Sequence, residues 1–309
     1  MPLISVVTPC YNEQENVEEV YRLVKGIFAA LPNYRYEHIF IDNASKDRTV
    51  DILKGIAKDD RNVKIIVNSR NFGYIRSPYH GLLQAHGDAV VQVVADLQDP
   101  PDMIKDFIKK WEEGYKIVLG VKTRSKEMAA MFLIRKFYYN LINKLSEIEL
   151  TKNYQGFGLY DKRIIEILRG IDDPHPYFRG LISEIGFESA KIEYTQQSRK
   201  SGISKSNFYK LYDVAMLGIT NHSKVPLRLA TMLGFFMSAL SLLIAMGYFI
   251  AKLTLWYNFP LGTAPVIIGL FFFSSIQLFF IGILGEYIGS IHTQVLKRPL
   301  VIEKERINF

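Results

Sequence analysis

The sequence predicts an α/β protein whose mostly parallel sheet carries helices on both faces and is followed by two membrane-spanning helices. Two observations lead to this prediction. Up to about residue 121, short β-branched runs alternate with longer amphipathic runs, which is typical of parallel strands joined by helices. Further along the 309-residue chain, residues 229–251 and 264–284 contain no Asp, Glu, Lys or Arg.

The alternation in the first part assigns its elements in order. The β-branched runs predict strands at residues 3–8, 38–42, 63–68, 89–94 and 116–121. The amphipathic runs between them predict helices at residues 15–30, 48–58, 79–85 and 103–113. A basic and aromatic helix is expected at residues 126–145, and an irregular region rich in Gly and Tyr is expected after it.

The two uncharged runs are predicted to span a membrane. Each exceeds the roughly 18 apolar residues that a spanning helix needs, and at about 1.5 Å per residue each covers a hydrocarbon core of roughly 30 Å. The alternative is a buried core helix. Just before the first run, apolar side chains recur every three or four residues, which predicts a helix in the membrane plane, although a core-facing helix has the same periodicity. These side chains are Phe208, Leu211, Tyr212, Ala215, Met216 and Ile219.

The distribution of Lys and Arg predicts that both chain ends face the cytoplasm, because cations concentrate on the cytoplasmic side of membrane spans. The cations beside the runs are Lys224 and Arg228 before the first, Lys252 between them, and Lys297, Arg298, Lys304 and Arg306 after the second. The apolar residues 3–8 are too few for a signal peptide, and the single Cys10 agrees with a reducing compartment. The net charge of +7 is dispersed, which favours membrane headgroups over nucleic acid as a partner.

These features divide the chain into four parts. Residues 1–203 form a cytoplasmic α/β domain, residues 204–225 an amphipathic membrane-interface helix, residues 226–292 a two-helix transmembrane domain, and residues 293–309 a basic cytoplasmic tail. Small residues in the second run, Gly269, Ser274 and Gly282, would let helices approach closely, which is compatible with a homo-oligomer.

Oxygen-bearing side chains follow three of the predicted strands. Asn12 and Glu13 follow the first strand, and Asp42 ends the second. Asp96 and Gln98 follow the fourth, where Pro100 and Pro101 then stop the chain from continuing as a helix. Side chains at the carboxyl ends of parallel strands project into the crevice where such folds bind ligands. Carboxylate and amide oxygens suit Mg²⁺ or Mn²⁺ on a diphosphate, whereas zinc would call for His or Cys ligands. Taken alone, the stretch around Asp96 also fits an ordinary strand followed by a polar turn.

Five motifs in a fixed order give the chain a family resemblance. It resembles the inverting glycosyltransferases of family 2, and within them the polyprenyl-phosphate branch that includes dolichol-phosphate mannose synthase and the bactoprenol glucosyltransferases. The similarity runs from about residue 3 through both uncharged runs. The motifs are Pro9-Cys10-Tyr11-Asn12-Glu13, Asn43-Ala44-Ser45-Lys46-Asp47, Ser69-Arg70-Asn71-Phe72-Gly73, Ala95-Asp96-Leu97-Gln98-Asp99-Pro100-Pro101 and Ser198-Arg199-Lys200-Ser201-Gly202-Ile203-Ser204-Lys205.

The resemblance implies a GT-A nucleotide-diphospho-sugar transferase fold. It also implies transfer of a sugar from a UDP- or GDP-sugar to a membrane polyprenyl phosphate, undecaprenyl or dolichyl phosphate, on the cytoplasmic leaflet of a bacterial inner or plasma membrane. Carried onto this sequence, the resemblance assigns the nucleotide-sugar pocket to Pro9, Tyr11, Glu13, Asp42 and Asn43. It assigns Asp96 and Gln98 to a Mg²⁺ or Mn²⁺ ion on the diphosphate, and Arg124 and Arg135 to the acceptor phosphate. It assigns Arg199, Ser204 and Lys205 to a loop over the phosphates. For each arginine the alternative is a solvated surface charge.

The chain departs from the family pattern at three places. Val94 stands where the family usually has the first aspartate of Asp-Ala-Asp-Leu-Gln, and Asn43-Ala44-Ser45 replaces Asp-Gly-Ser. Gln155 and Gly156 occupy the region where relatives often carry a proposed catalytic aspartate. These losses leave open a second reading, in which the chain is a catalytically impaired, nucleotide-binding membrane scaffold.

The absence of the proposed catalytic aspartate near Gln155 and Gly156 does not exclude catalysis. A phosphate monoester has a second pKa of about 6, so the acceptor is mostly a dianion at neutral pH and needs no general base. Positioning of the acceptor and metal stabilisation of the leaving group would then supply most of the acceleration.

A processive polysaccharide synthase is less favoured, because Gln196-Gln197-Ser198-Arg199 is followed by lysine and does not reproduce the Gln-x-x-Arg-Trp motif.

Overall fold

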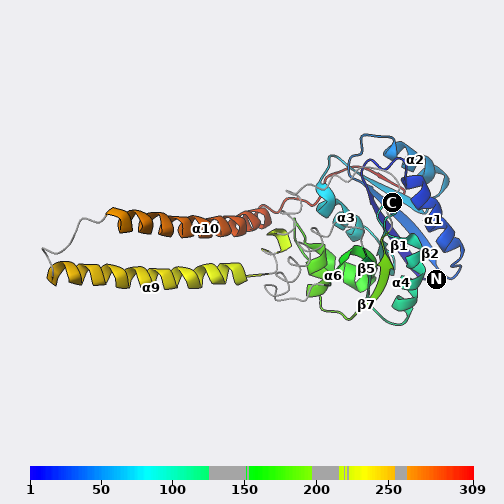
Figure 1. The fold of residues 1–309 in the computed structure, drawn as a ribbon. Helices are drawn as coiled ribbons and strands as arrows, with labels where there is room; N and C mark the ends of the chain where they lie inside the picture. The colour runs from blue at the N-terminus through cyan, green and yellow to red at the C-terminus, as the bar shows by residue number, and fades with distance from the viewer. Residues whose placement is uncertain (125–150, 152, 197–215, 219, 221–222, 255–262) are drawn as a thin grey trace.

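An eight-stranded sheet with the order β7-β5-β6-β4-β1-β2-β3-β8 organises the α/β part of the chain (Figure 1). The structure is a computed structural model, and it describes residues 1–309 except 125–150, 152, 197–215, 219, 221–222 and 255–262. The strands are β1 (Leu3–Cys10), β2 (Arg35–Asp42), β3 (Val63–Asn68), β4 (Ala89–Gln92), β5 (Ile117–Arg124), β6 (Tyr154–Asp161), β7 (Ser189–Thr195) and β8 (Glu303–Ile307).

The sheet is mostly parallel, as the sequence predicts. β1 lies at its centre and runs parallel to both β2 and β4, with Leu3 opposite Arg35 and Ile4 opposite Ala89. The pairs β2–β3 and β5–β7 are also parallel, whereas β6 runs antiparallel to β4 and β5, and β8 runs antiparallel to β3. The parallel register brings the carboxyl ends of β1, β2 and β4 to one edge of the sheet.

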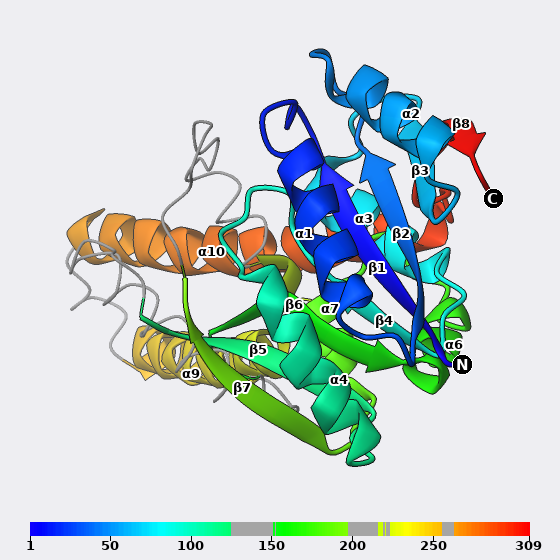
Figure 2. The same ribbon diagram turned by 90° about the vertical axis from the view of Figure 1, so that its right-hand side faces the viewer.

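Helices cover both faces of this sheet (Figure 2). Because strand side chains alternate between faces, Ile4 and Val6 of β1 pack with α1 and α4, while Val7 packs with α3, α6 and α7. Burying an aliphatic side chain of this size contributes about 1.5–3 kcal/mol, so both layers stabilise the sheet strongly. The helices are α1 (Val17–Ala29), α2 (Thr49–Asp59), α3 (Gly73–Leu83), η1 (Pro101–Met103), α4 (Ile104–Glu112), α6 (Lys162–Arg169) and α7 (Phe178–Glu184).

Two long helices, α9 (Val225–Thr254) and α10 (Thr263–Val295), extend side by side away from the α/β part (Figures 1 and 2). Each contains a stretch long and apolar enough to cross a membrane, Val225–Ile244 and Phe272–Val295, and neither stretch is buried in the protein. The Tyr287 hydroxyl donates a hydrogen bond of 2.6 Å to the Ser223 carbonyl, which ties α10 to the residues that precede α9.

The structure differs from the sequence prediction in several elements, since α6, α7 and β7, like β6, lie where an irregular region was expected. β6 lies in the region expected to be irregular, because Gly158 allows close strand contact: a Cβ there would lie 2.4 Å from the Val118 carbonyl oxygen. α3 begins at Gly73, not at residue 79, and accommodates Pro78 inside the helix. Residues 303–307, expected in a tail outside the α/β domain, form the edge strand β8. The expected helix at 126–145 lies outside the described residues, and so does most of the membrane-interface helix expected at 204–225.

Candidate active site

A cleft of about 790 Å³ lies at the carboxyl ends of β1, β2 and β4. Its walls come from the loops that follow these strands, from the first turns of α3, and from single side chains of β5 and β6. The lining residues are Pro9, Cys10, Tyr11, Asn12, Glu13, Gln14, Glu15, Asn16, Asn43, Asp47, Gly73, Tyr74, Ser77, Pro78, Gln92, Val94, Asp96, Gln98, Asp99, Lys122, Gln155 and Gln196.

The loops after β1 and β2 hold each other in place through hydrogen bonds. The Asn12 backbone N–H donates to the Ser45 hydroxyl at 2.8 Å, and the Asn12 side-chain oxygen accepts from the Lys46 N–H at 2.8 Å. The Glu13 N–H donates to the Thr49 hydroxyl at 2.9 Å. Both Asn12 and Ala44 adopt positive φ, at 56° and 62°, a conformation that asparagine accepts readily and alanine rarely does. These contacts fix the segment that carries Tyr11 and Glu13 along the cleft.

Asp42 does not line the cleft. Its side chain is fully buried, and it accepts hydrogen bonds from the Ser45 N–H and the Ser45 hydroxyl. Burial raises the pKa of this carboxyl, and the Ser45 hydrogen bonds act in the opposite direction. The structure therefore gives Asp42 a role in shaping the turn after β2, where the resemblance implied direct contact with the nucleoside.

Asn43 reaches the cleft, but the structure uses its whole amide group internally. Its side-chain oxygen accepts from the Phe72 N–H at 2.8 Å and from the Asn68 amide at 3.3 Å. Its side-chain nitrogen donates to the Gly73 carbonyl at 3.0 Å and to the Asn71 side-chain oxygen at 3.1 Å. Asn43 thus positions the turn before α3. Its effect on a ligand in the cleft is therefore indirect, through that turn.

The loop after β4 presents Asp96 and Gln98 to the cleft. The Gln98 N–H donates to Asp96 Oδ1 at 3.2 Å, and between them Leu97 has a φ of 55°. A bulky residue in this left-handed region costs roughly 1–3 kcal/mol, which the burial of the Leu97 side chain offsets. The side chain of Val94 lines the same wall and brings no charge.

The residues present fit a divalent cation that is shared with a substrate. Mg²⁺ is commonly held by one or two carboxylates together with waters and substrate phosphates, and the Asp96 carboxylate and Gln98 amide are donors of that kind. In the part of the chain that the structure describes, no group of three or more His, Cys, Asp or Glu side chains could hold a metal ion. The donor set therefore suits an ion that arrives with a diphosphate better than a permanent protein-only site.

A buried ion pair that the sequence analysis did not identify forms another part of the wall. Lys122 Nζ lies 3.8 Å from Asp99 Oδ1 and 2.6 Å from the Gln155 side-chain oxygen. The Tyr194 hydroxyl donates to Asp99 Oδ1 at 2.5 Å. Burial raises the pKa of Asp99, while the Lys122 charge and the Tyr194 hydrogen bond lower it. The cleft thus contains a fixed ammonium group as well as the Asp96 carboxylate.

The described residues bring together most of the predicted nucleotide pocket. Pro9, Tyr11, Glu13, Asp96 and Gln98 all line the cleft. Arg124 ends β5, and its side chain falls outside the described part of the structure. The other basic and hydroxyl residues predicted for the acceptor phosphate and the loop also lie outside the described residues: Arg135, Arg199, Ser204 and Lys205.

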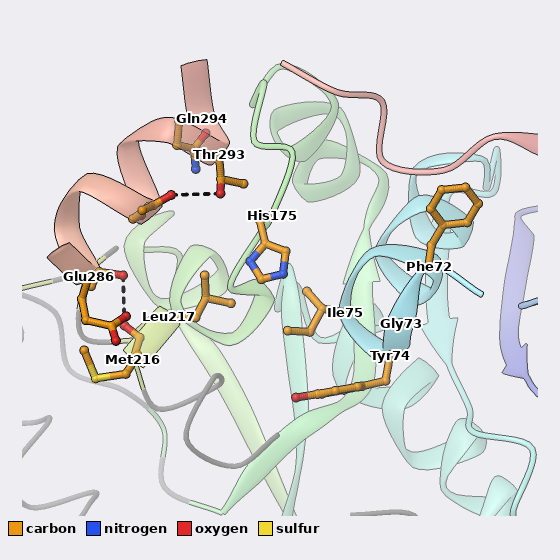
Figure 3. A pocket seen from close by; sticks show the side chains of 13 residues that line it. Phe72, Gly73, Tyr74, Ile75, His175, Met216, Leu217, Glu286, Thr293 and Gln294 are labelled. Carbon is orange, nitrogen blue, oxygen red and sulfur yellow. Dashed lines mark hydrogen bonds between the residues drawn. The ribbon is translucent and has the colours of Figure 1, made fainter. Parts of the chain in front are cut away.

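A second, smaller cavity of about 380 Å³ lies between the start of α3 and α10 (Figure 3). Tyr74, Ile75 and His175 face it from the α/β part, and Glu286 and Thr293 face it from α10. Gly73 and Tyr74 line this cavity and also the larger cleft. The start of α3 therefore separates the cleft from the surface of a candidate membrane helix.

Comparisons with known proteins find a matching family model and similar sequences. Residues 5–169 match the family model described as glycosyl transferase family 2. The chain is 35% identical over 306 residues to the uncharacterized glycosyltransferase YkcC of Bacillus subtilis (strain 168), covering 96% of this chain and 92% of that protein. It is 34% identical over 304 residues to the bactoprenol glucosyl transferase of Shigella phage SfII, covering 98% of this chain and 97% of that protein.

A solved structure supports the fold. The chain resembles a mycobacterial protein with a TM-score of 0.52 and 18% sequence identity, covering 71% of this chain and 73% of the other. At that identity the likeness shows the fold alone. Together with the family match to residues 5–169, it confirms the expected GT-A type of α/β architecture.

Proposed function

Since this chain belongs to glycosyl transferase family 2, we propose that it is an inverting glycosyltransferase that moves a sugar from a UDP- or GDP-sugar to a membrane polyprenyl phosphate. α9 and α10 would anchor it, with the α/β domain and both chain ends on the cytoplasmic side. One observation supports this proposal most directly. Gly73 and Tyr74 line both the polar cleft and the cavity against α10, so a soluble donor and a membrane-bound acceptor can approach the same point.

The donor would occupy the larger cleft. Pro9, Tyr11 and Glu13 would border the nucleoside, with Asn43 holding the neighbouring turn. Asp96 and Gln98 would face the diphosphate. When bound there, Mg²⁺ or Mn²⁺ would screen the negative charge that develops on the departing nucleotide diphosphate. The Lys122 ammonium, held by Gln155 and Asp99, adds a fixed positive charge to the same wall.

The chemical step needs no general base from the protein. An oxygen of the acceptor phosphate attacks the anomeric carbon, the bond from that carbon to the diphosphate oxygen breaks, and the nucleotide diphosphate leaves with the bonding electron pair. Attack from the face opposite the leaving group inverts the configuration. The acceptor is already mostly dianionic at neutral pH, which is compatible with Gln155 and Gly156 in place of an aspartate. We assign Arg124 and Arg135 to holding the acceptor phosphate, and Arg199, Ser204 and Lys205 to a loop over the donor phosphates.

A second candidate function is a nucleotide-binding membrane scaffold without turnover. The observation that favours it is Val94, whose apolar side chain lines the cleft where the family usually has a carboxylate. The two candidates differ in one measurable outcome, the formation of a lipid-linked sugar.

The test is a transfer assay on the purified full chain in detergent, with undecaprenyl phosphate, Mg²⁺ or Mn²⁺, and a panel of UDP- and GDP-sugars. The transferase proposal expects a lipid-linked sugar from one donor, lost by at least about 10²-fold in Asp96→Asn. Asp102→Asn is the matched control, because this carboxylate lies six residues away on η1, its side chain is 80% exposed, and it does not line the cleft. Nucleotide binding without product from any donor would support the scaffold instead.

A further inference from the structure

Two arginines flank the Phe72 ring, and a third, from the far end of the chain, lies near one of them: Arg76 donates to the carbonyl of Pro299, the residue after Arg298. The Arg70 guanidinium lies 4.0 Å from the centre of the Phe72 ring, and the Arg76 guanidinium lies 5.4 Å from it. Burial lowers the pKa of Arg76, and so do the nearby positive charges of Arg70 and Arg298. We call Arg70, Arg76 and Arg298 the arginine cluster.

In the part of the chain that the structure describes, no carboxylate balances the arginine cluster. Within the described ranges, none of the three guanidinium groups forms an ion pair with Asp or Glu. Arg70 donates to the Asn71 carbonyl at 3.2 Å, and Arg76 donates through Nη2 to the Pro299 carbonyl. Both acceptors are neutral, and the buried Arg76 Nε has no hydrogen-bond partner. A buried donor without an acceptor is costly, so the cluster calls for an anionic oxygen ligand.

The position of the cluster indicates where such a ligand comes from. Arg298 follows the candidate membrane stretch Phe272–Val295 by three residues. Phe72, on which two of the arginines stack, also lines the cavity against α10 (Figure 3). If α10 crosses a membrane, the cluster therefore lies at the level of the lipid headgroups. Ile75, Met216 and Leu217 give one part of the same cavity an apolar wall along which an acyl chain can lie, while Glu286 and Thr293 line the α10 side.

We propose that the arginine cluster binds the phosphate of an anionic phospholipid of the surrounding bilayer. The planar guanidinium fork matches phosphate oxygens in pairs, and stacking on Phe72 holds two of the forks in place before a ligand arrives. This site is separate from the residues that carry the sugar transfer. The inference rests on the membrane anchoring proposed above.

The test is native mass spectrometry of the full chain, released from a neutral detergent, with phosphatidylglycerol or phosphatidylcholine of identical acyl chains as the added lipid. Removing two of the three charges in Arg76→Gln/Arg298→Gln is expected to weaken phosphatidylglycerol binding about 30-fold, since each basic side chain near a membrane contributes a factor of roughly five and the two factors multiply. Phosphatidylcholine binding should not change. The matched control is Arg35→Gln/Lys58→Gln, two exposed cations at the start of β2 and on α2, away from α10 (Figure 1).

Three results would each overturn the inference. The first is equal binding of the two lipids to the unmodified chain, and the second is equal binding of phosphatidylglycerol by the arginine variant and the control variant. The third is displacement of phosphatidylglycerol by an equal concentration of inorganic phosphate or undecaprenyl phosphate. Melting temperatures of both variants, measured alongside, show whether each is folded. Sugar transfer measured on the same preparations separates this inference from the proposed function. Transfer without lipid preference refutes only the arginine cluster site, and lipid preference without transfer refutes only the transferase.

Discussion

Replacing Lys122 with methionine tests whether the wall of the cleft depends on a buried charge pair. The side chains of Lys122 and Asp99 are only 9% and 7% exposed, and their charged atoms are 3.8 Å apart. Two unit charges about 4 Å apart interact by roughly 4 kcal/mol at an effective dielectric constant of about 20. Measured costs of removing one partner from a buried pair are also about 3–5 kcal/mol, because the remaining charge stays buried without a counter-charge.

The assay is thermal unfolding of the full chain in one detergent at pH 8. A domain of this size shifts its melting temperature by about 2–4 °C per kcal/mol, so Lys122→Met should lower it by about 8–16 °C. Lys122→Met/Asp99→Asn should recover most of this loss, because it leaves no charge unpaired. The matched control is Lys54→Met. Its pair with Glu305 is shorter, at 2.6 Å, but both side chains are 41% exposed, so the loss should stay below about 1 kcal/mol.

The same variant should show a defined pH dependence. Burial raises the pKa of Asp99, and removing Lys122 removes the largest influence that lowers it. A carboxyl whose pKa is higher in the folded state than in the unfolded state stabilises the fold fully at pH values below its unfolded pKa of about 3.9. This stabilisation is lost as the pH rises through the folded-state pKa. Lys122→Met should therefore lose less stability at pH 5 than at pH 8. A loss no larger than that of Lys54→Met at both pH values would refute the coupling between Lys122 and Asp99.

Three further predictions concern the sheet and the turn before α3. Burial lowers the pKa of His38 to about 3, so at pH 5 the unfolded chain binds a proton on this side chain that the folded chain does not. The free energy of unfolding should therefore fall by about 2 kcal/mol from pH 7.5 to pH 5. Melting curves of His38→Gln should lack this fall. Asn43→Ala should leave the Phe72 N–H without its acceptor and lower the free energy of unfolding by about 1–3 kcal/mol. Titration calorimetry should show weaker nucleotide binding, and an unchanged affinity would contradict the positioning role of Asn43. Gly158→Ala should cost about 3 kcal/mol in chemical unfolding because its Cβ meets the Val118 carbonyl, whereas Gly55→Ala, with open space around it on α2, should be neutral or stabilising.

The central strands and two residues that line the cleft, Asp96 and Gln98, were predictable because their signals are local. β1 to β4 are apolar runs bounded by polar turns, and Asp96 and Gln98 lie in the loop that follows β4. Their position at a strand end determines where their side chains point, so their convergence on a cleft follows from the parallel sheet.

The missed features depend on contacts between distant segments. Lys122 reads as an ordinary exposed residue in its strand, and it is buried only because Gln155 and Asp99 supply its partners from elsewhere in the chain. β8 has the sequence Glu303-Lys304-Glu305-Arg306-Ile307, without the apolar alternation by which strands are predicted. Charged side chains are common on edge strands, where they discourage pairing with other molecules.

β8 also affects how the chain must be synthesised and how it can be dissected. It follows α9 and α10 in the sequence, yet it completes the sheet that begins with β1, so the two long helices form an insertion within the α/β fold. During translation the free edge of β3 stays open until both helices have been made, which makes closure of the sheet a late event that waits on their placement. A fragment cut before α9 would keep that edge open and would tend to associate through it. A soluble version of the enzyme should instead join the end of the α/β part to residues 299–309 by a short linker.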